Sequence, residues 1–135
     1  MNQRSSLEVW AYRLLYVSFV IAPIAAGLDK FYYYMVQWDK YLAPIIPRLL
    51  FNMDPRAIMT LVGVVEVGAG VLVAFRPRIG AMIVALWLFG IVVNLLLTQA
   101  YYDIALRDFG LALAALSFAV ISRECGWTRC HVRSY

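Results

Sequence analysis

The sequence predicts an all-α integral membrane protein: one domain, built as a bundle of four transmembrane helices with a short interfacial helix or loop after helix 1. Composition is the first observation behind this prediction. Of the 135 residues, 64% are hydrophobic and 15% are charged, against about 45–50% and 25% in soluble domains. A soluble domain of this length has too much surface for its volume to cover so many apolar side chains. The second observation is that the apolar residues form four runs long enough to cross a bilayer, which takes about 20 residues each.

The first run covers residues 9–28 and holds one charge, Arg13, close enough to its end for the side chain to reach the headgroups. A cleaved signal peptide is the alternative reading. Its apolar core usually spans about 7–15 residues, which is shorter than this run, and Asp29-Lys30-Phe31 continues poorly from a cleavage site. We therefore expect a retained helix.

Three further apolar runs follow. They cover residues 57–75, 79–98 and 104–121. Arg76-Pro77-Arg78 joins the second run of the chain to the third. Because Pro77 cannot continue the preceding helix, these two runs are expected to form a tight antiparallel hairpin.

The segment between the first two runs is rich in aromatic residues, of the kind enriched at membrane–water interfaces. Pro44 and Pro47 interrupt its apolar stretch, and Pro55 follows. This pattern predicts a short interfacial or re-entrant helix and no further crossing. The aromatic residues are Phe31, Tyr32, Tyr33, Tyr34, Trp38 and Tyr41.

The net charge of +4 does not indicate nucleic-acid binding, because the basic residues are scattered between apolar runs and form no continuous patch. They indicate orientation instead, since cytoplasmic loops carry an excess of Lys and Arg. The Arg76-Pro77-Arg78 turn lies on the same side as both ends of the chain. We therefore expect both termini, with a tail over residues 122–135, to be cytoplasmic.

Glu66 is the most informative candidate for a ligand-binding residue. It lies near the middle of its run, where an acid costs about 2.5–3.5 kcal/mol on insertion scales. Helical spacing places Gly63, Val67 and Gly70 on or beside the same face, so Glu66 is expected to point into the bundle. One reading is a proton-titrating or ligand-binding carboxylate, and the other is a structural hydrogen bond between helices.

Four further polar residues are candidates for ligand binding. Asn94, in the third run, is either a ligand contact or a hydrogen bond between helices. Asp103 and Arg107 have the i, i+4 spacing that favours an ion pair, although Arg107 could pair with Asp108 instead or bind an anion or a quinone carbonyl. With Lys30 at the end of the first run, these residues could surround one opening of the bundle.

Cys125, Cys130 and His131 lie together in the expected cytoplasmic tail, where thiols stay reduced. They are weak candidates for a metal site, because a structural zinc site usually has four ligands. The cysteines are also spaced more widely than a C-x-x-C redox pair. We therefore expect free thiols, and a disulfide only if the topology is inverted.

The sequence lacks the complete motifs of several enzyme classes. It contains no phosphate-binding glycine loop, G-x-S-x-G or H-E-x-x-H pattern. The four runs contain no histidine, so a bis-histidine haem site within the membrane is excluded. No catalytic residue is assigned, and whether the chain is an enzyme stays open.

Four segments together resemble the DoxX family of small four-helix bacterial membrane proteins. They are residues 26–31 (AGLDKF), 63–70 (GVVEVGAG), 76–80 (RPRIG) and 103–110 (DIALRDFG). The resemblance covers nearly the whole chain after its first residues and implies a bacterial cytoplasmic (inner) membrane. It also implies a connection with oxidoreductase assemblies, including thiosulfate:quinone oxidoreduction, and with soluble partners. Lys30, Glu66 and Arg107 match polar positions of the pattern, without a catalytic role that could be transferred.

The function expected from these observations is a small membrane subunit or anchor of an oxidoreductase or respiratory-type assembly, in contact with partner subunits or further copies of itself. It would have no intrinsic cofactor and no complete catalytic set, and a quinone is the ligand considered. The alternatives are a proton-coupled transporter that uses Glu66, and the membrane part of a thiosulfate:quinone oxidoreductase whose redox groups reside on a partner.

Overall fold

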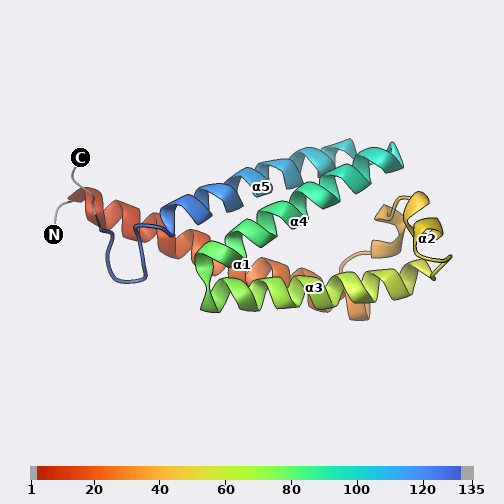
Figure 1. The fold of residues 1–135 in the computed structure, drawn as a ribbon, viewed down its shortest axis with the longest axis horizontal. Coiled ribbons are helices and arrows are strands. Elements are labelled where there is room, and N and C mark those ends of the chain that lie inside the picture. The colour runs from red at the N-terminus through yellow and green to blue at the C-terminus, as the bar shows by residue number, and fades with distance from the viewer. Residues whose placement is uncertain (1–2, 132–135) are drawn as a thin grey trace.

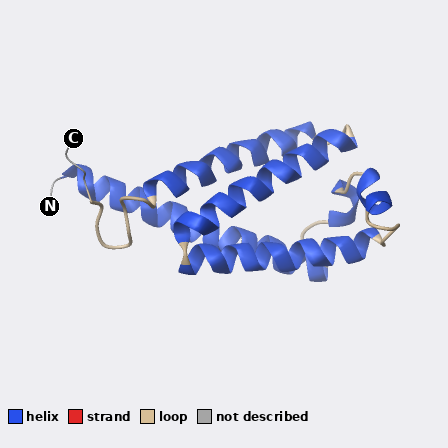
Figure 2. Cartoon of the chain, in the orientation of Figure 1, coloured by secondary structure: helices blue, strands red, loops and turns tan. Residues whose placement is uncertain are grey.

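The computed structural model describes the backbone of residues 3–131 and the side chains of residues 6–131. Within this range the chain is helical apart from short connections (Figure 2). Its elements are α1 (Gln3–Tyr32), η1 (Trp38–Tyr41), α2 (Ile45–Leu49), α3 (Pro55–Phe75), α4 (Pro77–Thr98) and α5 (Tyr102–Ile121). The end of the predicted tail, residues 132–135, lies outside the described residues.

Four of the described helices, α1, α3, α4 and α5, are long and apolar enough to cross a membrane, as the four apolar runs of the sequence predicted. The short elements η1 and α2 occupy the loop in which a short helix was expected. The main difference is the length of α1, which extends beyond residues 9–28 in both directions. It continues past Asp29 and Lys30 because both charged side chains find partners inside the protein.

The long helices form two antiparallel pairs (Figure 1). α1 packs along α3, α4 packs along α5, and the turn at Arg76 connects the pairs. The pairs contact each other near this turn and diverge toward the opposite end, where η1 and α2 lie beside the start of α3 (Figure 1). We call the end near Arg76, which also holds the start of α1 and the segment that follows α5, the terminal end, and the opposite end the loop end.

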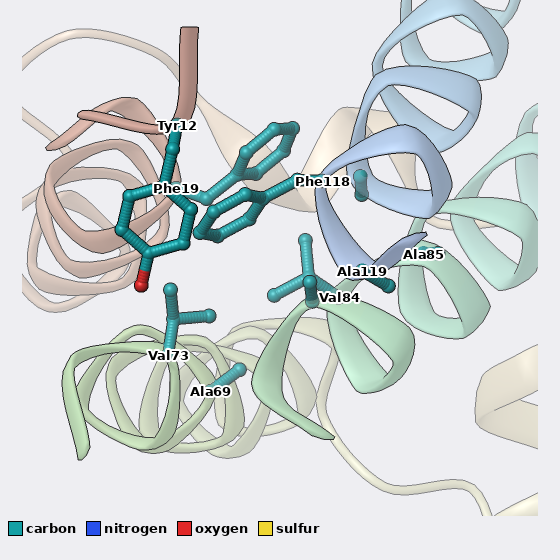
Figure 3. Packing of buried hydrophobic residues seen from close by; sticks show 10 residues of the cluster. Tyr12, Phe19, Ala69, Val73, Val84, Ala85, Phe118 and Ala119 are labelled. Carbon is teal, nitrogen blue, oxygen red and sulfur yellow. The ribbon is translucent and has the colours of Figure 1, made fainter. Parts of the chain in front are cut away.

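The hydrophobic core joins the two pairs close to the terminal end (Figure 3). The rings of Phe19 on α1 and Phe118 on α5 stack with centroids 6.0 Å apart. Val73 on α3 and Val84 on α4 complete the contact and are buried. Gly80 allows α3 and α4 to approach, because a Cβ atom there would lie 2.5 Å from the backbone of Val73.

Small residues also bring α1 and α3 together. A Cβ atom on Gly70 would lie 2.6 Å from the side chain of Ile24 and 2.9 Å from the carbonyl oxygen of Val20. Gly63 meets Gly27 in the same way. The face of α3 that carries Gly63, Glu66 and Gly70 therefore packs against α1, as the spacing of small residues predicted.

The outward faces of the long helices are apolar, with exposed side chains such as Leu14, Ile21, Leu86 and Val120. Large exposed apolar surfaces are unusual on soluble monomers. On four helices of membrane-spanning length, they are the surface that lipid or another membrane protein would cover.

Candidate functional site

A buried ion pair links α1 to α3. The ammonium nitrogen Nζ of Lys30 donates a hydrogen bond to Oε2 of Glu66 over 2.6 Å. The two side chains are 5% and 9% exposed. Lys30 follows Gly27 by one helical turn and Glu66 follows Gly63 by one turn. Because α1 and α3 are antiparallel, the two residues lie on opposite sides of the glycine contact, and the long Lys30 side chain reaches past Gly63 to Glu66. Lys30 thus places a compensating positive charge beside the buried Glu66 carboxylate.

Trp38, in η1, covers this ion pair. Nζ of Lys30 lies 3.7 Å from the centre of the indole ring, a distance at which the ring attracts the cation. The indole Nε1 donates to Oδ2 of Asp29 over 2.7 Å. The other oxygen of Asp29 accepts hydrogen bonds from the backbone nitrogens of Tyr34 and Met35. Asp29 thus fixes the chain as it leaves α1 and holds Trp38 above Lys30.

Asp108 extends the charged group to α5. Its side chain is 10% exposed and accepts a hydrogen bond from Nε of Arg107 over 3.3 Å. The positive charge of Lys30 also attracts Asp108. We call Lys30, Glu66 and Asp108 the charged cluster; its residues come from three different helices.

Of the two partners that the sequence offered for Arg107, the described residues show a pair with Asp108 and none with Asp103. The physical reason is the difference in burial. Asp103 is exposed in the first turn of α5, where an ion pair contributes little. A buried carboxylate such as Asp108 destabilises the protein much more when it has no partner. Of the four residues that were expected to surround one opening, Lys30 and Asp108 are buried, whereas Asp103 and Arg107 are exposed.

Asn94 ties α4 to the loop, and the hydrogen bonds of its side chain go to the loop and not to Glu66. Its Oδ1 accepts a hydrogen bond from the backbone nitrogen of Ala43 over 2.9 Å. Its Nδ2 donates to the carbonyl oxygen of Tyr41 over 2.7 Å. These are two backbone groups in the segment that carries Trp38, so Asn94 positions this segment across the loop end.

Trp87 carries a buried donor on the same face of α4. Val84, Trp87 and Asn94 share one stripe of the helix by their spacing, and Val84 belongs to the core. The indole Nε1 of Trp87 is buried and has no hydrogen-bond partner within the described part of the chain. Most buried polar groups in proteins have a partner, so this nitrogen marks a place where an acceptor would be stabilised.

A second polar region lies in the outer loop, where Tyr33, Gln37, Asp39 and Arg56 line a cavity of about 170 Å³. Burial raises the pKa of Tyr33, and the negative charge of Asp39 raises it further. The guanidinium of Arg56 lies 4.6 Å from the centre of the Tyr33 ring, and its positive charge opposes the rise in this pKa.

The expectation of free thiols in the tail is wrong in this structure, because Cys125 and Cys130 form a disulfide. After α5 the backbone folds back on itself: Gly126 N donates to Arg129 O and His131 N donates to Glu124 O. This turn places the two cysteines opposite each other as a bridged pair, with Cα atoms 3.9 Å apart. Sequence spacing alone could not reveal the reversal, since no glycine–proline or Asn–Gly turn signal marks it.

The disulfide lines an open depression of about 1020 Å³ at the terminal end. Glu8 on α1 reaches the same place, and its carboxylate lies within 4.8 Å of both sulfur atoms. His131 also lines the depression, but among the described residues it is not part of the group whose ligand atoms lie within 4.8 Å of one another. The charged side chains around it include Arg78, Arg123 and Glu124.

Sequence reasoning found Lys30, Glu66 and Asn94 but missed Glu8, Asp29, Trp38 and Trp87 as parts of these sites. Trp38 was interpreted as an interfacial aromatic residue, and only the fold of the loop shows that it covers Lys30. Glu8 precedes the first apolar run as an isolated acid. No local pattern connects it with cysteines at the other end of the chain.

The fold and these sites define a four-helix bundle of membrane-spanning length with a buried charged cluster. Comparisons with protein-family models, with curated proteins and with solved structures find no match to the chain. Its function is therefore argued from its own residues.

Proposed function

We propose that this protein is a small integral membrane subunit of an oxidoreductase or respiratory-type assembly and that the charged cluster helps to bind the carbonyl head of a quinone. The observation that carries the proposal is the buried Lys30–Glu66 ion pair between two apolar helices. Ionisable residues within membrane helices are costly and usually mark ligand or ion sites. A buried ion pair is also often no more stable than apolar residues of the same volume, so stability alone is a weak reason to keep one.

Lys30 has the chemistry that a quinone carbonyl requires. An ammonium group offers three donors and no acceptor, and one of the three is directed to Glu66. Trp87 adds an indole donor on α4. Glu66 precedes the Arg76 turn on α3 and Trp87 follows it on α4 by a similar number of residues, so they lie at comparable depth. Donors from both helix pairs thus come from the same level of the bundle.

A partner is proposed because the charged cluster supplies groups that could bind a quinone but none that could exchange electrons with it. Within residues 6–131, the charged cluster contains one ammonium and two carboxylates, none of which accepts electrons. The exposed apolar faces of the helices offer the surface for subunit contacts. The membrane part of a thiosulfate:quinone oxidoreductase is one assembly of this kind.

We further propose that the protein resides in the bacterial cytoplasmic membrane with both termini in the cytoplasm. The support is the Arg76-Pro77-Arg78 turn at the terminal end. The resemblance of four segments to the DoxX family supports the bacterial source and the link with oxidoreductases. A transporter that uses Glu66 as a proton carrier is less well supported, because Lys30 holds that carboxylate in an ion pair.

The test is purification of the tagged protein from native membranes, with mass spectrometry of bound proteins and extracted lipids. We expect an oxidoreductase subunit and a quinone to be enriched over an unrelated four-helix membrane protein. If neither is enriched, the proposal is wrong. If the purified protein instead carries a bound substrate other than quinone, and if the Glu66→Gln protein lacks it, the result would favour the transporter.

A paired variant separates binding from structural stability. Lys30→Met together with Glu66→Leu removes both charges, which often leaves stability unchanged. Hydrogen bonds to charged groups contribute about 1.5–3 kcal/mol, so we expect bound quinone to fall by at least about tenfold. Asp39→Leu with Lys40→Met is the matched control, since these loop residues are exposed. Unchanged quinone in a folded Lys30–Glu66 variant would mean that the pair is only structural.

A further inference from the structure

Three potential metal ligands meet at the terminal end, far from the charged cluster. The two sulfur atoms of Cys125 and Cys130 and a carboxylate oxygen of Glu8 all lie within 4.8 Å of one another. Glu8 belongs to α1 and the cysteines follow α5. The packing of Tyr12 and Phe19 on α1 against Phe118 on α5 holds these two elements together.

We propose that Cys125, Cys130 and Glu8 form a zinc site when the disulfide is reduced, so that the tail alternates between a disulfide state and a zinc-bound state. Thiolate and carboxylate are regular zinc ligands, and a tetrahedral site takes four. The fourth position falls to His131, which lines the same depression, or to water. This inference goes beyond the proposed function and does not depend on it.

The change of state needs a reductant, and a dithiol has the required chemistry. Its first thiolate attacks one sulfur of the Cys125–Cys130 bond and forms a mixed disulfide. Its second thiolate then releases the protein as a dithiol, so that two electrons pass to the cysteines and the reductant becomes a cyclic disulfide. Zinc replaces the two thiol protons, which are released to solvent. Glu8 contributes its carboxylate directly.

The surroundings of the cysteines favour this chemistry. Arg78 and Arg123 line the depression, and nearby positive charge stabilises thiolate over thiol. The depression is open to solvent on the terminal end, with Glu8 and His131 exposed, so that a dithiol and a metal ion can reach the sulfur atoms. Only a small rearrangement is required, because the three ligand atoms already lie close together.

The experiment uses the purified full chain in detergent, either oxidised or reduced with excess dithiol that is then removed by anaerobic gel filtration. Zinc binding is measured by competition with a chromophoric chelator. We expect one zinc ion per reduced chain and at least about tenfold weaker binding to the oxidised chain. Cobalt in place of zinc should give intense visible bands of a tetrahedral site and sulfur-to-cobalt charge transfer, which would report the thiolates directly.

Glu8→Gln tests the carboxylate. Even outer-sphere partners change metal affinity by about 10–100-fold, so loss of this ligand should weaken zinc binding at least about tenfold. Glu124→Gln is the matched control, because Glu124 is exposed and lines the same depression but is not among the three clustered ligands. It should bind as the wild type does.

The proposal would be overturned if the reduced and oxidised wild-type chains bound zinc with equal affinity. It would also be overturned if Glu8→Gln, like Glu124→Gln, bound zinc with the affinity of the wild type. Helical circular dichroism of each variant establishes that the chain is folded. Cys125→Ser with Cys130→Ser should abolish the charge-transfer band; persistence of that band would also contradict the site.

Discussion

Gly27 and Gly63 meet across α1 and α3 so closely that a Cβ atom on either would lie 2.7 Å from the carbonyl oxygen of the other. The obstructing atom is backbone and cannot rotate away as a side chain does. Lys30 and Glu66 lie one helical turn from this contact on their own helices, on opposite sides of it, and Nζ of Lys30 reaches Oε2 of Glu66 at 2.6 Å. The glycine contact therefore sets the separation of the helices at which the buried ion pair forms.

Gly27→Ala is expected to destabilise the protein by about 1–3 kcal/mol, the usual range for overpacking. The added methyl group must push α1 from α3, which also lengthens the contact between Lys30 and Glu66. The measurement is loss of helical circular dichroism in mixed micelles with increasing denaturing detergent.

Gly68→Ala and Gly90→Ala are the matched controls, since a Cβ atom at either position meets nothing within 4 Å. In a helix interior, Ala is favoured over Gly by roughly 0.5–1 kcal/mol, so both controls should be as stable as wild type or more so. A Gly27→Ala protein as stable as these controls would mean that α1 and α3 are not packed as described.

The ion pair predicts strong coupling between its two residues. Lys30→Met alone leaves Glu66 buried without its cation, and Glu66→Leu alone leaves Lys30 without its anion. Each single change should destabilise the protein by about 3–5 kcal/mol, whereas the double variant should be close to wild type. Unfolding of the four proteins of this cycle gives the coupling energy. Single effects that simply add in the double variant would contradict a buried pair.

The sequence was sufficient to predict the four long helices, since each apolar run has the length that a helix needs to cross a bilayer. It also predicted that Glu66 points inward, because Gly63 and Gly70 mark the packed face of α3. It could not identify the partner of Glu66. Lys30 lies at the end of an apolar run, and only the antiparallel register of α1 against α3 brings it opposite the middle of α3.

The other contacts that the sequence did not determine have a similar origin. Spacing along one helix suggested a pair of Asp103 with Arg107, but burial by other helices decided in favour of Asp108. The disulfide depends on a chain reversal after α5 that no residue pattern marks. Local periodicity thus predicts elements and their faces, whereas contacts between distant segments depend on the packed structure.

Tyr33 gives the outer loop a dependence on alkaline pH. Its pKa is raised above the usual value of about 10, so the unfolded chain loses this proton first as the pH rises. The stability that Tyr33 contributes is present below about pH 10 and is lost as the pH rises through the folded-state pKa. Tyr33→Phe should therefore lose less stability than wild type above about pH 10, as measured by thermal unfolding.

Arg56→Gln supports the same test, because removal of this cation should raise the pKa of Tyr33 further. Tyr34→Phe is the control, since the Tyr34 side chain is largely exposed. The interpretation would be wrong if Tyr33→Phe and Tyr34→Phe had the same stability profile in alkaline solution.

Asn94→Leu should release the loop from α4, because it removes the hydrogen bonds to Tyr41 and Ala43. The backbone amide hydrogens of residues 33–54 should then exchange faster with solvent, and this segment should become sensitive to protease, while the long helices stay protected. Thr98→Val is the matched control: its hydroxyl bonds only to the carbonyl oxygen of Asn94 in the same helix. Equal exchange in the loop of both variants would show that Asn94 does not hold it.

The orientation of the chain determines the state of Cys125 and Cys130 in the cell. Disulfides persist in oxidising compartments and are rare in the cytoplasm, whereas the Arg76-Pro77-Arg78 turn favours a cytoplasmic terminal end. We therefore expect growing cells to contain the reduced pair, with both thiols trapped before lysis by a membrane-permeant maleimide added with a membrane-permeant zinc chelator. A disulfide should form only after treatment of the cells with a thiol oxidant. If the cysteines instead resist the maleimide in untreated cells, and alkaline phosphatase fused after Tyr135 is active, the terminal end faces the oxidising side and the proposed orientation is inverted.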